Sequence, residues 1–352
     1  MEMTATFCSY DLQFLQASGT SRGIITNKTS YFIKIKSHGQ YGYGECGLLK
    51  GLSFDDVPDY EAKLQWACEN ISLGIHQLWE MLRAYPSIQF GLEQAFLSLE
   101  SNPPFELFPT PFTQGANTIP INGLVWMGSE DFMKNQIDAV IDKGFTCVKM
   151  KIGAIEWAQE LNLLKSLRKR YNRSSLEIRV DANGAFTFNE AQKVIKELAV
   201  IDVHSIEQPL AAKNIEELAQ LCSKPLIPIA LDESLIPCIR DEQKQALLDQ
   251  VKPQYIILKP SFVGGFKGSD YWISLAETRG IGWWATSALE SNVGLNAISQ
   301  WVFNKKNDMP QGLGTGSLYS NNIPSPLYVK NGAVGYDQKQ LWNLKNIDEL
   351  CM

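Results

Sequence analysis

The chain has 352 residues, 45% of them hydrophobic and 20% charged, which is typical of a globular protein with a large buried core. Its formal net charge of -6 argues against nucleic acid or an anionic membrane surface as the main partner. No apolar run is long enough to span a membrane, and the first residues lack the basic and apolar regions of a secretory leader.

Cysteine and histidine usage adds two expectations. The seven cysteines are odd in number and scattered, without a C-x-x-C pair, which is typical of free thiols in a reducing cytoplasm. We therefore expect a cytoplasmic protein. The chain has 3 histidines, so an enzyme that transfers protons here is expected to use another residue type as its base.

Residues 1–112 are predicted to form a separate α+β capping domain. Two runs, 4–15 and 31–47, have the pattern of antiparallel strands, the second with a turn near residues 37–39. Helical patterns follow at 59–71 and 91–100.

Two further segments are expected to belong with the capping domain. Residues 18–23, "SGTSRG", are rich in small residues and are predicted to form a mobile loop that closes over a site. The tail, residues 331–352, is expected to return to this domain.

Residues 113–330 are predicted to form a (β/α)7β TIM-like barrel. Short apolar runs alternate here with amphipathic helices, and we expect strands at 119–127, 147–153, 176–183, 204–210, 228–234, 255–260, 282–290 and 311–316. Charged residues near successive strand ends are 32, 26, 25 and 27 residues apart: Lys149, Asp181, Glu207, Asp232 and Lys259. One strand plus one helix repeats at this spacing in a barrel. A doubly wound sheet is the competing fold, but no G-x-G-x-x-G follows the first strand.

The predicted strand at 147–153 carries two lysines on one face. Side chains two residues apart lie on the same face of a strand, so Lys149 and Lys151 point one way and Met150 the other. The alternative without a functional role is a surface strand whose two lysines are solvated. Helices cover the outer face of a barrel strand, so we expect both lysines at the barrel mouth instead.

Three acids, Asp181, Glu207 and Asp232, fall at the ends of consecutive predicted strands. Converging carboxylates repel one another unless a cation lies between them. Hard oxygen ligands suit Mg²⁺, and the lack of a nearby histidine or thiol argues against zinc. For a single acid, helix capping or a surface ion pair is the better interpretation; for three on successive strands we favour a metal site.

The lysines suggest a reaction. Two adjacent ammonium groups near a metal are expected to lower each other's pKa, so that Lys149 positions and tunes while Lys151 takes a proton. Lys259 comes from the opposite side of the ring. This arrangement suits proton removal from a carbon next to a carboxylate, with the metal stabilising the enediolate.

The motifs K-x-K, D-x-N, E-x-P, D-E and K-P on successive strands resemble those of the enolase superfamily, in the subgroup of muconate cycloisomerases, dipeptide epimerases and o-succinylbenzoate synthases. The resemblance covers nearly the whole chain. It implies Mg²⁺, with Mn²⁺ as a substitute, bound by the three acids, Lys151 as base and Lys259 as the opposing lysine. It also implies supporting roles for Asn183 and Glu233, and Arg179 is a further supporting candidate from its inward face.

Within that subgroup, four stretches are similar to o-succinylbenzoate synthases of menaquinone biosynthesis: 179–186, 258–266, 287–301 and 312–316. That resemblance implies a small-molecule carboxylate substrate. The implied reaction is dehydration of 2-succinyl-6-hydroxy-2,4-cyclohexadiene-1-carboxylate to o-succinylbenzoate. The sequence makes no prediction of oligomeric state.

Two alternatives stay open at this point: an epimerase or racemase of the same superfamily, and a catalytically silent binding protein. Dipeptide epimerases typically carry an Asp-x-Asp at the end of the eighth strand, whereas residues 312–322 contain no carboxylate. A buried substrate ammonium without a counter-charge is costly. Small or hydroxylated residues are instead expected to contact the substrate or leave room for it: Ser261, Ser287, Gly314 and Thr315.

Overall fold

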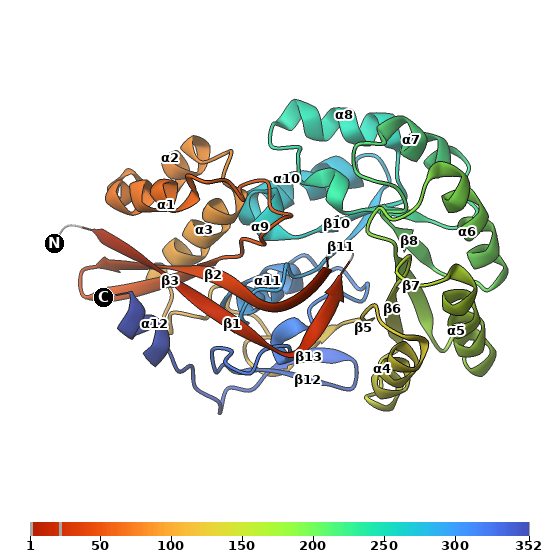
Figure 1. The fold of residues 1–352 in the computed structure, drawn as a ribbon. Helices are drawn as coiled ribbons and strands as arrows, with labels where there is room; N and C mark the ends of the chain where they lie inside the picture. The colour runs from red at the N-terminus through yellow and green to blue at the C-terminus, as the bar shows by residue number, and fades with distance from the viewer. Residues whose placement is uncertain (1–2, 21–22, 352) are drawn as a thin grey trace.

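The computed structural model describes residues 3–20 and 23–351. It combines an antiparallel three-stranded sheet near the N-terminus with a seven-stranded parallel sheet farther along the chain. Figure 1 shows helices packed on the antiparallel sheet and a second set of helices along the outside of the parallel sheet. The chain is therefore an α/β protein with a separate antiparallel part, as the sequence predicted.

The antiparallel sheet is built from β1 (Thr4–Thr20), β2 (Gly23–Ser37) and β3 (Gln40–Cys46), paired in that order. His38 and Gly39 join β2 to β3 with φ of 50° and 82°, the positive values that a two-residue hairpin turn requires, and they confirm the predicted turn. Of the predicted closing loop at 18–23, residues 18–20 and 23 are paired in β1 and β2, while residues 21–22 lie outside the described residues.

Helices cover one face of this sheet: α1 (Tyr60–Glu69), the 3₁₀ turn η1 (Ile71–Leu73), α2 (Gly74–Met81) and α3 (Pro86–Glu100). Helix α3 lies unusually close to β3. A Cβ atom on Gly44 would lie 1.9 Å from the carbonyl oxygen of Gly91, and one on Gly42 would lie 2.1 Å from that of Ala95. Glycine at both positions of β3 therefore sets the distance between the helix and the sheet.

A buried acid in this part predicts a pH dependence of stability. Asp55 is fully buried, and its Oδ2 accepts hydrogen bonds from the amide (2.9 Å) and hydroxyl (2.6 Å) of Ser87. Burial raises the pKa of Asp55 to about 7. The folded state then binds a proton on the Asp55 carboxyl group more tightly than the unfolded state does. The free energy of unfolding therefore falls as pH rises from about 4 to about 7, and this group causes no further change above that range.

We expect Asp55→Asn to remove this dependence. Between pH 5 and pH 8 the free energy of unfolding of the unmodified protein should fall by about 3 kcal/mol more than that of the variant, because roughly two pKa units of the shift lie within this window. Urea denaturation at the two pH values measures both differences. Parallel pH profiles for the two proteins would contradict the prediction.

The seven parallel strands pair in the order β11-β10-β9-β8-β7-β6-β5, so neighbours in the sheet are also neighbours in the sequence. Their bounds are β5 (Gly123–Val125), β6 (Cys147–Lys151), β7 (Glu177–Asp181), β8 (Ser205–Glu207), β9 (Ile229–Leu231), β10 (Tyr255–Leu258) and β11 (Gly282–Ala285). The helices between and after them are α4 (Glu130–Asp142), α5 (Trp157–Arg170), α6 (Phe188–Val200), α7 (Ile215–Ser223), α8 (Asp241–Val251), α9 (Pro260–Val263), α10 (Gly265–Glu277) and α11 (Asn292–Asn304).

The strands are shorter than predicted, and the charged residues mark their ends. Lys151, Asp181 and Glu207 are the last residues of β6, β7 and β8, while Asp232 and Lys259 directly follow β9 and β10. The carboxyl ends of parallel strands lie at one edge of the sheet. The fold therefore brings all five residues to the same edge.

The eighth predicted strand, residues 311–316, does not form a regular strand. Gln311 makes a parallel bridge to Ile121, and Gly312 makes one to Thr286. A Cβ on Gly312 would lie 2.0 Å from Oγ1 of Thr286, so this close approach requires glycine. The segment thus contacts the chain next to both outer strands of the sheet before it turns into the 3₁₀ helix η3 (Thr315–Ser317).

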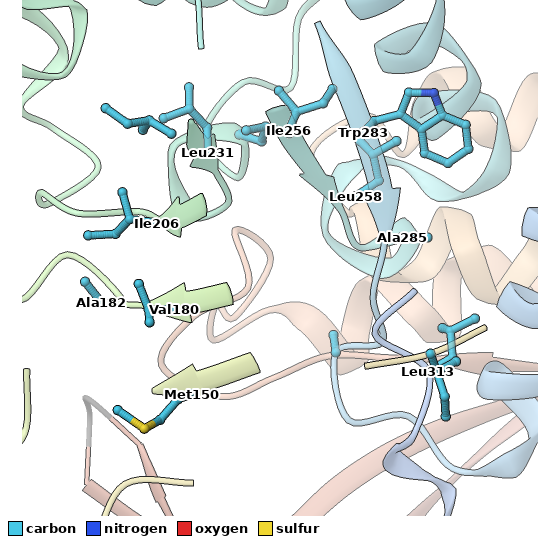
Figure 2. Close-up of a cluster of buried hydrophobic side chains, with 14 of the residues drawn as sticks. Met150, Val180, Ala182, Ile206, Leu231, Ile256, Leu258, Trp283, Ala285 and Leu313 are labelled. Carbon is cyan, nitrogen blue, oxygen red and sulfur yellow. The ribbon is translucent and has the colours of Figure 1, made fainter. Parts of the chain in front are cut away.

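The predicted alternation of faces is confirmed. Side chains of one face belong to the large core under the helices, among them Met150, Val180, Ile206, Leu231, Ile256 and Leu258 (Figure 2). Ile257, Ala230 and Trp284 belong to a separate small cluster. Asp232 and Lys259 share this second face, because they lie two residues after Ala230 and Ile257. The other strand-end charges lie one residue after first-face members of their own strands, so they also point to the second face.

The C-terminal residues contain a correction to the sequence analysis. Strand β12 (Leu327–Lys330) pairs with β13 (Ala333–Tyr336), and β13 pairs with β4 (Ile119–Pro120). Helix α12 (Lys345–Leu350) contacts β1. Cys8 and Cys351 form a disulfide with a Cα–Cα distance of 5.0 Å. The expectation of free thiols is therefore wrong for this pair, because the fold brings together residues 343 apart in sequence.

Five other cysteines are free: Cys46, Cys68, Cys147, Cys222 and Cys238. Over the described ranges, no helix combines the length and apolar character needed to cross a membrane. The domain limits near residues 112 and 330 stay predictions. The return of the tail to the capping domain also stays a prediction.

Candidate active site

Lys151, Asp181 and Glu207 form one row across the sheet. In the register of β6, β7 and β8, Lys151 is opposite Asp181, and Asp181 is opposite Glu207. Both acids are buried, and Lys151 is partly buried. The sequence predicted that these three side chains lie together, and the structure confirms the proximity.

Lys149 is the central cation of the cluster. Its Nζ lies 2.9 Å from Oδ2 of Asp181 and 2.7 Å from Oε2 of Glu207. Lys149 lies two residues before Lys151 on the same face of β6, so it reaches the two acids from deeper in the sheet. Lys149 therefore bridges two of the predicted metal ligands.

Lys151 is held from two sides. Its Nζ lies 3.0 Å from Oδ2 of Asp181 and donates a 2.6 Å hydrogen bond to Oδ1 of Asn183. The amide group of Asn183 also donates to Oε1 of Glu233 at 2.9 Å. Asn183 has a φ of 44°, a left-handed conformation that costs energy and is common at functional sites. Asn183 thus links Lys151 to Glu233, which agrees with the supporting roles predicted for both.

Lys259 forms the other wall, where its Nζ makes an ion pair with Oδ2 of Asp232. Oε2 of Glu233 is buried and accepts no hydrogen bond from any described residue. The cluster thus contains four carboxyl groups and three ammonium groups. They are Asp181, Glu207, Asp232 and Glu233, and Lys149, Lys151 and Lys259.

The pKa shifts follow from this crowding. Burial lowers the pKa of Lys149, but Asp181, Glu207 and Asp232 outweigh burial and raise it above the usual lysine value. The prediction that neighbouring ammonium groups would lower this pKa is therefore wrong for Lys149, because carboxylates are its dominant neighbours. The pKa of Lys259 is also raised, with burial opposed chiefly by Asp232.

The pKa values of the acids shift in opposite directions. Burial acts to raise the pKa of Asp181, but the ammonium groups of Lys149 and Lys151 prevail and lower it. For Glu207, burial and then repulsion by Asp181 raise the pKa well above the usual value. The cluster contains four carboxyl groups and three ammonium groups, so the acids outnumber the lysines. The cluster has the charge and the oxygen donors to accept a further hard cation.

The donors are not gathered around a single point. Among residues 3–20 and 23–351, no three His, Cys, Asp or Glu side chains are arranged to hold a metal ion. Lysine ammonium groups lie between the acids instead, at Asp181, Glu207 and Asp232. The carboxylate oxygens are donors of the kind that Mg²⁺ prefers, whereas their arrangement is not that of a formed metal site, so the predicted ligand roles stay predictions.

A cavity of about 730 Å³ lies above this cluster. Its polar lining includes Lys149, Lys151, Asp181, Asn183 and Lys259. Such a volume is in the range of small-molecule sites. The charged groups at one end and apolar walls elsewhere suit a carboxylate with a hydrocarbon ring.

Three of the four predicted substrate residues line the cavity: Ser287, Gly314 and Thr315. The hydroxyls of Ser287 and Thr315 are 2.6 Å apart and hydrogen bonded. Ser261 is fully buried outside this lining, and its hydroxyl donates to Glu290 at 2.6 Å. Ser261 lies in α9, where its hydroxyl is used by Glu290 and does not line the cavity.

Arg179 also lies away from the predicted ligands. Its Nε donates to Glu177 at 2.6 Å, its Nη1 donates to the carbonyl of Pro310 at 2.9 Å, and its guanidinium stacks over Trp284. It faces inward as predicted, but a step of two residues along β7 places it about 7 Å below Asp181. These contacts give no support to a role around the metal ligands.

Sequence reasoning missed the apolar walls of the cavity. Leu49 and Leu52 follow β3 in the N-terminal part, Trp126 follows β5, Leu289 follows β11, and Ile25 lies near the start of β2. The leucines stand in "CGLLKGLS", an apolar loop directly after a strand. This apolar loop could have indicated a cavity wall, since binding residues concentrate in loops next to rigid strands.

Comparisons with known proteins agree with this geometry. The family described as enolase C-terminal domain-like matches residues 133–339. The o-succinylbenzoate synthase of Desulfotalea psychrophila is 43% identical to this chain and covers 95% of this chain and 99% of its own. The L-Ala-D/L-Glu epimerase of Bacillus subtilis is 24% identical, over 76% of this chain and 75% of that protein.

Solved structures are similar to this chain over nearly its whole length. The crystal structure of MenC from Desulfotalea psychrophila superposes with a TM-score of 0.84 at 38% identity, over 95% of this chain and 100% of that one. A muconate lactonizing enzyme from Pseudomonas fluorescens has a TM-score of 0.82 at 18% identity, over 100% and 98% of the two chains. At 18% identity, the similarity to the muconate lactonizing enzyme shows a shared fold and nothing more.

Proposed function

Because the chain belongs to the enolase C-terminal domain-like family, we propose that it is an o-succinylbenzoate synthase, a lyase that dehydrates 2-succinyl-6-hydroxy-2,4-cyclohexadiene-1-carboxylate. The observation that carries the proposal is 43% identity to such an enzyme over 95% of this chain. The lysines and acids at one end of the cavity supply the chemistry that this reaction needs.

We further infer that the parallel sheet is the wall of a (β/α)7β barrel, with residues 311–312 in the place of the eighth strand. The bridges from Gln311 to Ile121 and from Gly312 to Thr286 support this closure. In such a barrel the active site is built from the carboxyl ends of several strands, which is where the cluster lies.

The proposed cofactor is Mg²⁺, with Mn²⁺ as a substitute, held by Asp181, Glu207 and Asp232. When bound, the ion would stabilise the negative charge that develops on the substrate carboxylate as its α-proton leaves. The excess of carboxyl groups over ammonium groups in the cluster supports a need for further positive charge at this point.

Lys151 is the proposed base. Asp181 and Asn183 hold its Nζ at the end of β6, facing the cavity. The neutral amine takes the proton from the carbon next to the substrate carboxylate. The resulting ammonium then donates a proton to the departing hydroxyl on the same face. One C–H bond and one C–O bond break, a ring double bond forms, and water leaves.

Lys259 is proposed to support charge without exchanging a proton. We expect Lys259→Ala to lower kcat by about 10²–10³, as does the loss of other groups that stabilise a developing oxyanion. Steady-state kinetics measures this loss, and Lys193→Ala serves as the control because Lys193 is an exposed lysine on α6 outside the cavity lining. Near-unchanged turnover in a folded Lys259→Ala variant would contradict the proposed opposed lysines.

The substrate is tested against the epimerase alternative. The segment 312–322 has no carboxylate to bind a substrate ammonium, so we expect efficient dehydration and negligible epimerisation of L-Ala-D/L-Glu dipeptides. Both assays are run on one preparation with Mg²⁺. Robust epimerisation without dehydration would overturn the proposed substrate and leave the family assignment intact. Slow racemisation of an N-acylamino acid beside dehydration would leave both intact, since one enediolate site can serve both reactions.

A further inference from the structure

A second buried charged network joins the N-terminal strands to the wall of the candidate site. Lys28 on β2 is 4% exposed, and the charged groups that act on it most strongly are Glu45 on β3 and Glu290 after β11. Both carboxyl groups are fully buried. Lys28 donates to the hydroxyl of Ser30 (3.2 Å), which donates to Glu45 (2.7 Å). The catalytic cluster has no member in this network.

Glu45 reaches from the N-terminal sheet to the start of helix α11. Its carboxylate accepts hydrogen bonds from the amides of Ser291 (2.8 Å) and Gly294 (2.9 Å) and from the hydroxyl of Ser291 (2.5 Å). Amide groups in the first turn of a helix have no partner within the helix, and the helix dipole favours a negative charge there. Glu45 therefore holds the point at which the chain enters α11.

Glu290 holds the loop between β11 and α11. One of its oxygens accepts from the hydroxyl of Ser261 (2.6 Å), and the other accepts from the amide of Ala288 (2.6 Å). A Cβ on Gly47, just after β3, would lie 2.6 Å from Oε1 of Glu290. The N-terminal part thus packs directly on this carboxyl group.

The loop that these contacts hold is part of the cavity wall. Ala288 and Leu289 both line the cavity. Leu289 has a φ of 62°, and its carbonyl accepts a 2.7 Å hydrogen bond from the hydroxyl of Tyr319. A left-handed leucine is strained by about 1–3 kcal/mol and persists where its surroundings hold it. The network supplies such surroundings.

We propose that Lys28 and Glu45 are positioning residues, which hold Ala288 and Leu289 in place as a wall of the substrate cavity. The choice of substrate in the test rests on the proposed function; the network itself does not. Without Lys28, the two buried carboxyl groups lose the cation that acts on both of them, so the loop they hold should shift. Lys151 lies on β6, outside these contacts, so substrate binding should suffer more than proton transfer.

The kinetic test compares variants of Lys28 and Glu45. We expect Lys28→Met to raise KM about tenfold and to leave kcat within about threefold, because uniform binding is lost and the reacting groups stay in place. Lys28→Arg, which keeps the charge, should recover most of the loss. Glu45→Gln should act like Lys28→Met, since its amide N–H would oppose the donors at Ser291 and Gly294.

Glu93→Gln is the matched control. Glu93 on α3 accepts the amides of Phe266 (2.5 Å) and Lys267 (3.1 Å) at the start of α10, the same kind of contact away from the cavity lining. This variant should leave KM unchanged. An equal rise in KM for Glu93→Gln and Glu45→Gln would show a general effect of weakened packing and would overturn the proposal.

Hydrogen exchange separates this proposal from the proposed function. The amides of Ala288, Ser291 and Gly294 should exchange faster in Glu45→Gln and Lys28→Met than in the unmodified protein, with or without substrate. Faster exchange in a protein that shows no dehydration would support the network and overturn the proposed reaction. Unchanged exchange and unchanged KM in either folded variant would overturn the network. If Lys28→Met does not fold, Glu45→Gln carries the same test.

Discussion

Replacing Lys151 by alanine is expected to abolish dehydration, with a loss of kcat of at least about 10⁴. General acid–base groups typically contribute about 10²–10⁴, and here one amine is proposed to serve both as the base for the α-proton and as the acid for the departing hydroxyl. Its position at the end of β6, 3.0 Å from Asp181 and 2.6 Å from Asn183, fixes it for both roles. Steady-state kinetics on the cyclohexadiene substrate measures the loss.

Lys151→Arg distinguishes a base from a fixed charge. A guanidinium stays protonated in proteins, so this variant keeps the positive charge and cannot accept a proton. It should be as inactive as Lys151→Ala. Exchange of the α-proton with solvent deuterium should also stop in both. Lys193→Ala, on α6 and outside the cavity lining, should retain activity. Substantial turnover by a folded Lys151→Arg variant would assign the base to another residue.

Much of the candidate site was predictable from sequence because its determinants are local. Alternation along a strand decides which side chains share a face, so Lys149 and Lys151 had to lie together. A repeat of one strand and one helix then brings Asp181, Glu207 and Asp232 to one edge. Neither inference needs knowledge of long-range packing. The structure accordingly confirms the proximity of Lys149, Lys151, Asp181 and Glu207.

What the sequence did not show depends on contacts between distant segments. Cys8 and Cys351 meet because α12 packs on β1, and no local pattern contains that contact. Lys28 has an ordinary polar position in a strand, and the charge of Glu290, far along the chain, acts on it only in the folded protein. The pKa of Lys149 rises for the same reason: three acids from three other segments surround it. Charge balance inside a protein is a property of the assembled fold.

The second large effect on activity is expected from a substitution at the proposed Mg²⁺ site. Asp232→Asn should lower Mg²⁺ affinity by at least about tenfold and kcat/KM by about 10² or more, because a neutral amide replaces one of three proposed carboxylate ligands. Isothermal titration with Mg²⁺ measures the affinity independently of turnover. Chelation of the unmodified protein should abolish dehydration and leave the circular dichroism spectrum unchanged, since the core under the helices contains apolar side chains.

Two controls make this result interpretable. Asp232 also pairs with the buried Lys259, so thermal unfolding of Asp232→Asn must be measured beside its kinetics. Asp249→Asn removes an exposed acid that pairs with Arg279, and it should change neither Mg²⁺ binding nor activity. If a folded Asp232→Asn variant bound Mg²⁺ and turned over like the unmodified protein, Asp232 would not be a ligand. The ion pair with Lys259 would then be its whole role, and the acids left to bind the ion would be Asp181, Glu207 and Glu233.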